Sequence, residues 1–159
     1  MKATLGGLEA ARMGPGMVQR VQDNPHDRLR ATPFVKPFQL SSAMLEDVLT
    51  SSDFRRFTVV REPSSRLLSA YLEKIRQGLK QSDDVVAALA DRGQTVQAAD
   101  VTLAQFVDVV SGQDSRDQDP HWRRQADHLG LDVVPYDAVI HLEDLDASWG
   151  RIAELTGIP

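Results

Sequence analysis

The stretch 56–71 constrains the fold more than any other part of the chain, because it reads as a strand, a turn and a helix in unbroken succession. Phe57–Val60 is a short apolar run rich in β-branched residues, which is typical of a strand. Pro63 cannot continue such a strand but suits the first turn of a helix, and Ser64 or Ser65 can supply a capping oxygen. The sequence therefore predicts a strand that leads directly into a helix.

The predicted helix carries apolar side chains on one face and ends at or soon after Gly78. The apolar positions at helical spacing are Leu67, Leu68, Tyr71, Ile75 and Leu79. This arrangement places Arg61 at the carboxyl end of a buried strand and Ser69 on the helix that follows. Open α/β sheets bind their ligands at that edge, and a guanidinium with a nearby hydroxyl suits a phosphate or a sulfate. The residues alone thus predict an anion site.

Length and composition are those of an ordinary globular protein. With 159 residues, 42% hydrophobic and 26% charged, the chain is expected to form a single domain over residues 1–159. No apolar run is long enough to span a bilayer, and the N-terminus lacks the apolar core of a signal peptide. We therefore expect a cytoplasmic protein with no transmembrane segment in this chain.

Several classes of function lose their support in the sequence. The chain has no cysteine, which excludes disulfides, thiolate metal sites and cysteine nucleophiles. Its net charge of -5 argues against non-specific nucleic-acid binding. The motifs of P-loop hydrolases, Rossmann folds, zincins and serine hydrolases are all missing. His121 and His128 could share a helix face, but with no third ligand in the pattern we expect no metal site.

The rest of the chain alternates helix signals with polar loops. Two helices are expected over 1–13 and 83–90, and a third from Ser41 or Ser42 to Leu49. A fourth helix is expected to begin at a capping box of Thr102 and Gln105 and to end at Ser111, and a fifth to run from Asp146 or Ser148 to Gly157. A strand is expected over 136–142. The segment 18–37 reads as loop and contains His26. The segment 121–125 places a histidine, an indole and two arginines close together after Pro120. It is either a candidate site or the start of a helix in which Trp122 is half buried and the arginines are solvated.

Two blocks of the sequence resemble one family. Phe57–Pro63, followed by Arg66, Leu67, Ser69, Ala70, Tyr71 and Lys74, resembles the 3′-phosphate-binding motif of the carbohydrate sulfotransferases that use 3′-phosphoadenosine 5′-phosphosulfate (PAPS). That family includes the membrane-anchored Golgi enzymes acting on chondroitin, dermatan and related glycans, and their soluble bacterial relatives. The segments 119–125, 136–140 and 142–145 resemble its downstream pattern, although Arg124 stands where many members have proline. Together the two blocks cover residues 54–157.

The resemblance implies an α/β fold with a P-loop-like sulfotransferase core, in which a mostly parallel sheet is flanked by helices. It implies PAPS as the sulfuryl donor, with Arg61 and Ser69 holding the 3′-phosphate. Arg66 either contacts this cofactor or pairs with Glu62 four residues earlier. The implied reaction is in-line transfer of a sulfuryl group to a hydroxyl of a carbohydrate acceptor, and His26 and His121 are the candidates for the base that takes the proton.

The sequence departs from the family at its N-terminus. Family members open with a strand and a loop whose lysine and hydroxyls hold the 5′-phosphosulfate at a helix N-terminus. Residues 1–5 instead look like the helix after that loop, so we expect the first strand and the loop to be missing. Two hypotheses follow: a PAPS-dependent sulfotransferase, or a catalytically inactive remnant that binds adenosine bisphosphate. In a third interpretation the chain is an unrelated α/β domain in which Arg61 only makes an ion pair.

Overall fold

The computed structural model describes residue 35 and residues 37–157 of the chain. These residues divide between two compact units, one formed by residues 55–151 and the other by the described residues up to 54 together with those from 152 onward. The expected helix over 1–13, the expected loss of a first strand and loop, and His26 lie outside the described residues.

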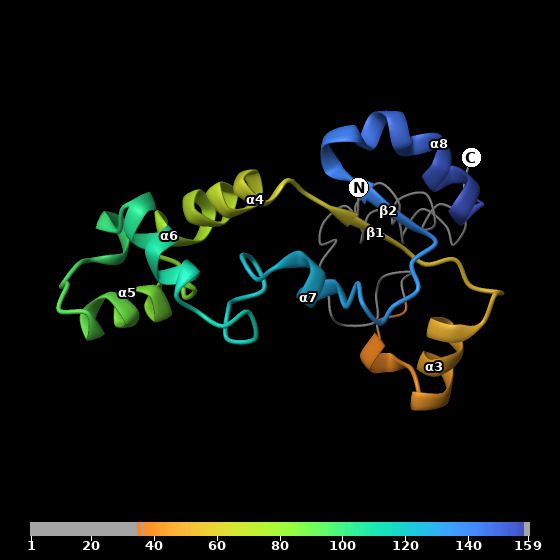
Figure 1. Ribbon diagram of the computed structural model, residues 1–159, viewed down its shortest axis with the longest axis horizontal. Coiled ribbons are helices and arrows are strands. Elements are labelled where there is room, and N and C mark those ends of the chain that lie inside the picture. The colour runs from red at the N-terminus through yellow and green to blue at the C-terminus, as the bar shows by residue number, and fades with distance from the viewer. Residues whose placement is uncertain (1–34, 36, 158–159) are drawn as a thin grey trace, which may run out of the picture. The chain divides into compact units, whose positions relative to one another are not determined.

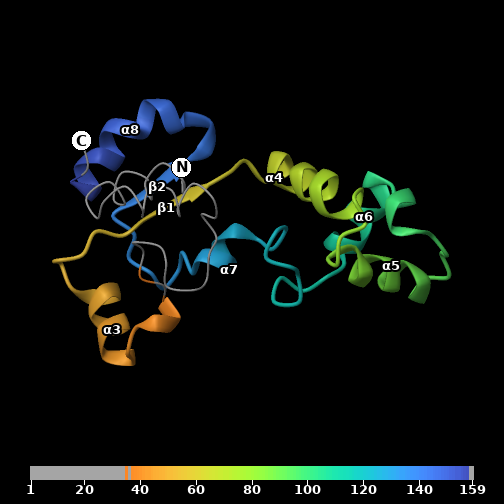
Figure 2. The same ribbon diagram turned by 180° about the vertical axis from the view of Figure 1, so that it is seen from behind.

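A pair of parallel strands organises the unit of residues 55–151. Strand β1 (Phe57–Val60) pairs with β2 (Ala138–His141), in a register that sets Phe57 opposite Ala138. The two strands lie side by side in both views of the ribbon (Figures 1 and 2). Because the strands are parallel, their carboxyl ends meet at one edge. The predicted α/β fold with a parallel sheet and helices is confirmed for the described residues.

The other regular elements that the structure describes are helices and helical turns. In the same unit they are α4 (Pro63–Ala70), the π-helical turn η2 (Tyr71–Ile75), α5 (Ser82–Asp91), η3 (Ala98–Asp100), α6 (Leu103–Ser111), α7 (Gln125–Leu129), η4 (Leu142–Asp144) and α8 (Leu145–Thr156), whose last residues belong to the other unit. The other unit also contains η1 (Pro37–Gln39) and α3 (Ser42–Thr50). Among the described residues no helix is both long and apolar enough to cross a membrane.

Local capping signals decide several helix ends. Ser41 caps α3 by accepting from the N–H of Met44, as predicted. The capping box of Thr102 and Gln105 at the start of α6 is also confirmed. The prediction for the last helix is wrong at its start, because the chain already turns into η4 after β2 and α8 begins at Leu145, before the proposed caps.

The hydrophobic core of this unit gathers around Phe106, which is fully buried. Its ring lies 5.9 Å from that of Tyr71 in a stacked arrangement and 5.3 Å from that of Trp122 at an interplanar angle of 90°. Trp122 is only 5% exposed, so the prediction that it is half buried is wrong. The reason is its contact with Phe106, which comes from a helix well upstream in the sequence. This core holds α4 and the segment before α7 in place through Tyr71 and Trp122.

Candidate anion-binding site

Arg61 and Ser69, the residues predicted to form an anion site, are in direct contact. Arg61 follows the last residue of β1, and Ser69 lies on α4, so the tight turn between strand and helix brings the two together. Nη1 of Arg61 donates to Oγ of Ser69 at 2.7 Å, and both side chains are half-buried. The guanidinium is therefore directed along α4 at the carboxyl edge of the parallel strands.

The main chain of Arg61 is held by a residue far away in the sequence. Oε1 of Gln125 accepts from the N–H of Arg61 at 2.8 Å, and Nε2 of Gln125 donates to the carbonyl oxygen of Arg61 at 2.6 Å. Gln125 is the first residue of α7 and is itself half-buried. No local pattern in the sequence indicates this role for Gln125, although the residue belongs to the second block that resembles the family.

Glu62 shapes the turn between β1 and α4, and the prediction that a serine caps this helix is wrong. The Glu62 carboxylate accepts from the N–H of Ser64 at 3.0 Å, from the hydroxyl of Ser64 at 2.5 Å and from the N–H of Ser65 at 2.6 Å. These bonds lower the pKa of Glu62 to about 2, and the bond from the Ser64 hydroxyl has the largest effect. The Glu62 carboxylate thus accepts from the first free N–H groups of the helix, which a capping serine hydroxyl would otherwise bond.

The other side of the turn is fixed by Glu143, in η4 directly after β2. Its Oε1 accepts from the N–H of Glu62 at 2.9 Å, and this bond is the main reason why the pKa of Glu143 lies below its ordinary value. The N–H groups of Arg61 and Glu62 are thus bonded to side chains from two different elements, Gln125 in α7 and Glu143 in η4.

Arg66 has partners that the sequence did not indicate. Its Nη1 donates to the carbonyl oxygen of Arg123 at 2.7 Å and its Nη2 to that of Pro120 at 2.6 Å. The predicted pairing with Glu62 is wrong, because the Glu62 carboxylate caps α4 instead. Partial burial lowers the pKa of Arg66, whose guanidinium ties α4 to the segment before α7.

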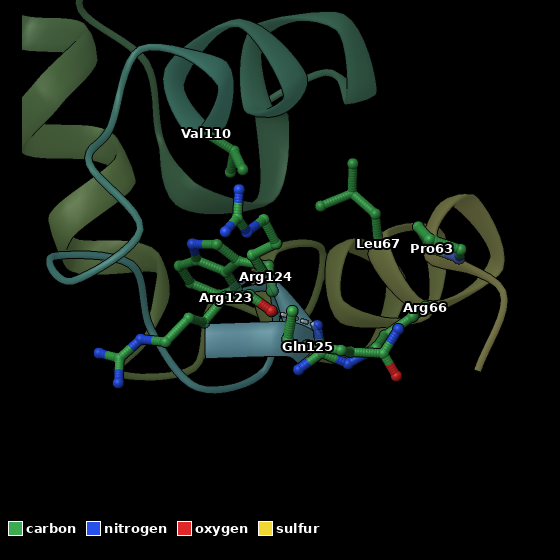
Figure 3. Close-up of a pocket in the computed structure, with 9 residues that line it drawn as sticks. Pro63, Arg66, Leu67, Val110, Arg123, Arg124 and Gln125 are labelled. Carbon is green, nitrogen blue, oxygen red and sulfur yellow. Dashed lines mark hydrogen bonds between the residues drawn. The ribbon is translucent and has the colours of Figure 1, made fainter. Parts of the chain in front are cut away.

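A cavity of about 300 Å³ lies beside this network (Figure 3). Pro63 and Leu67 of α4 and Val110 of α6 contribute apolar surface to it. The remaining lining residues are Arg66, Trp122, Arg123, Arg124, Gln125 and Ala126. The cavity therefore shares α4 and Gln125 with the anion site, and three of its lining residues are arginines.

His121, one of the two candidate bases, lies in the turn before α7 and is exposed. Its Nδ1 is 2.6 Å from Oδ1 of Asp119, which also accepts from the N–H of His121 at 2.8 Å. In the neutral tautomer that donates from Nδ1 to Asp119, Nε2 carries the lone pair of the ring. Among the described residues there is no group of three or more side chains suited to a metal ion.

Comparison with known proteins matches residues 16–159 to a family model described as "Sulfotransferase family". The matched range includes both strands, the turn with Arg61 and Ser69, and Gln125. Neither the curated proteins nor the solved structures gave a match.

Proposed function

The chain belongs to the sulfotransferase family, and from that premise we propose that it takes a sulfuryl group from PAPS and transfers it to a hydroxyl of a carbohydrate. Sulfuryl transfer to an acceptor is the general chemistry of the family. The choice of PAPS and of a carbohydrate rests on the resemblance of residues 57–74 and 119–145 to the carbohydrate sulfotransferases.

The observation that carries the proposal is the contact of 2.7 Å between Nη1 of Arg61 and Oγ of Ser69. A guanidinium offers five N–H donors, so its remaining donors can bind a phosphate dianion. Because Oγ of Ser69 accepts from Arg61, its own O–H is free to donate to a phosphate oxygen. The pair therefore fits the 3′-phosphate of the donor, with one charged and one neutral contact on the same group.

In the proposed reaction PAPS supplies the sulfuryl group, whose bond to the phosphate oxygen breaks as the acceptor oxygen attacks sulfur in line. Arg61 and Ser69 hold the nucleotide by its 3′-phosphate. A histidine takes the proton of the acceptor hydroxyl, and His26 and His121 are the two candidates. The contact between Asp119 and Nδ1 of His121 supports His121, because it leaves Nε2 basic. Arg66 contributes indirectly, by holding Pro120 and Arg123 next to α4.

Binding of adenosine 3′,5′-bisphosphate, measured by calorimetry, tests the proposed donor site. We expect Arg61→Ala to reduce binding below detection, because the variant loses the charged donor. Arg76→Ala is the matched control, since Arg76 is an exposed arginine just after the π-helical turn that continues α4. Full affinity in Arg61→Ala would refute the proposed site.

Transfer from radiolabelled PAPS to a panel of glycans tests the proposed reaction. We expect label in a glycan product, and we expect His121→Ala to lower the transfer rate if this residue takes the proton. An unchanged rate in His121→Ala would assign the base to His26. Tight binding of adenosine 3′,5′-bisphosphate without any transfer would identify the chain as the inactive binding module.

A further inference from the structure

Gln125 makes an unusual contact for a side chain, because its one amide satisfies both main-chain groups of Arg61. The bonds measure 2.8 Å from Arg61 N to Oε1 and 2.6 Å from Nε2 to Arg61 O. We infer that Gln125 is a positioning residue that holds Arg61 in place for the 3′-phosphate. This inference rests on the proposed function, which supplies the ligand.

Arg61 needs such a partner because it lies just past the end of β1. The last residue pair between β1 and β2 is Val60 with His141, so Arg61 lies beyond the strand ladder. Its neighbour Glu62 uses its N–H to reach Glu143 on the side of β2. In an extended chain the N–H groups of successive residues point to opposite edges, so the N–H and C=O of Arg61 face away from β2. Gln125 supplies their hydrogen bonds there.

Few side chains can replace Gln125 in this role. A side-chain amide carries a donor and an acceptor side by side, as a peptide group does, whereas a carboxylate only accepts and an ammonium group only donates. Gln125 therefore acts as one more peptide unit at the end of β1. Its amide is already bonded to Arg61 through both atoms, so we assign it a positioning role rather than direct contact with a ligand.

The position of the Arg61 guanidinium depends on how firmly the main chain of Arg61 is held. Ser69 is held by α4, whose capping by Glu62 fixes its first turn. Arg61 belongs to neither a helix nor a strand. The position of its Cα therefore depends on Gln125 and on the hydrogen bond from the N–H of Glu62 to the Glu143 carboxylate. A shift of the main chain at Arg61 moves the guanidinium away from Ser69 and from the phosphate that the two are proposed to bind.

The experiment compares two nucleotides that differ only in the 3′-phosphate. In Gln125→Met, which keeps the length of the side chain and removes both hydrogen bonds, we expect the Kd for adenosine 3′,5′-bisphosphate to rise about tenfold. The Kd for 5′-AMP, which lacks the 3′-phosphate, is expected to change less than about twofold, within the scatter of a lost neutral contact.

The matched control is Gln118→Met, since Gln118 is another half-buried glutamine whose amide binds a main-chain carbonyl, that of Val110 at 3.0 Å. We expect normal affinity for both nucleotides in this variant. If Gln125→Met is poorly folded by circular dichroism, Gln125→Asn serves instead, because it keeps the amide but is one methylene too short to make both bonds. An equal loss of affinity for both nucleotides in Gln125→Met would overturn the inference.

Hydrogen exchange at the amide of Arg61 separates this inference from the proposed function. If the wild-type protein binds both nucleotides equally, the proposed 3′-phosphate site is refuted, yet the contact can still be tested without ligand. We expect Gln125→Met to raise the exchange rate of the Arg61 amide at least about tenfold, because its acceptor is lost. An unchanged exchange rate would show that Gln125 does not hold Arg61, and would overturn the positioning role.

Discussion

Removal of the Ser69 hydroxyl isolates one contact of the proposed 3′-phosphate site. Oγ of Ser69 lies 2.7 Å from Nη1 of Arg61, so in Ser69→Ala the guanidinium loses its anchor and the phosphate loses one donor. A hydrogen bond to a charged group contributes about 1.5–3 kcal/mol, which corresponds to a rise in Kd of about tenfold to 150-fold. Ser69 is half-buried, so water replaces part of the lost contact and we expect a value near the lower end, about tenfold.

Calorimetric titration with adenosine 3′,5′-bisphosphate at constant ionic strength measures this loss. Ser69→Thr keeps the hydroxyl and is expected to bind more tightly than Ser69→Ala. Ser111→Ala is the control, because Oγ of Ser111 bonds only to a carbonyl of its own helix, that of Asp108 at 3.0 Å. Wild-type affinity in Ser69→Ala, or equally weak binding in the threonine and alanine variants, would show that the Ser69 hydroxyl does not contact the phosphate.

Three further predictions concern the frame that supports the site. Tyr71→Phe removes the hydroxyl that donates to the buried carbonyl oxygen of Val101 at 2.9 Å, and should lower the free energy of unfolding in urea by about 1–3 kcal/mol. Tyr136→Phe removes a similar bond at a half-buried site and should lower the free energy of unfolding by less. Phe106→Ala should cost about 3–5 kcal/mol in the same assay, and a smaller loss would contradict its central place in the core. The folded-state pKa of Glu62, about 2, lies below its ordinary 4.5, so its contribution to stability is present above pH 4.5 and is lost as the pH falls toward 2. Glu62→Gln should therefore show a shallower fall in thermal midpoint over that interval, and parallel curves for the two proteins would refute the capping role.

The parts of the site that are close in sequence could be predicted without the structure. Arg61 and Ser69 are separated by one tight turn, and the apolar run before Pro63 and the helical periodicity after it are enough to bring them together. The capping box of α6 follows from a pattern of the same kind. The parallel pairing of β1 with β2 was instead implied by the family resemblance. Such signals are legible because each depends on a few neighbouring residues and on the period of one element.

The partners of the long polar side chains depended on the tertiary structure. Glu62 was available to pair with Arg66 or to cap α4, and both choices are compatible with helical spacing. Arg66 instead bonds carbonyls that lie 54 and 57 residues further along the chain, and Gln125 reaches back 64 residues to Arg61. A glutamine in a polar segment has no periodic or capping signature that points to such a partner. Only the packing of the 120–125 segment against α4 brings its amide to the end of β1, where an unpaired peptide group would otherwise be costly.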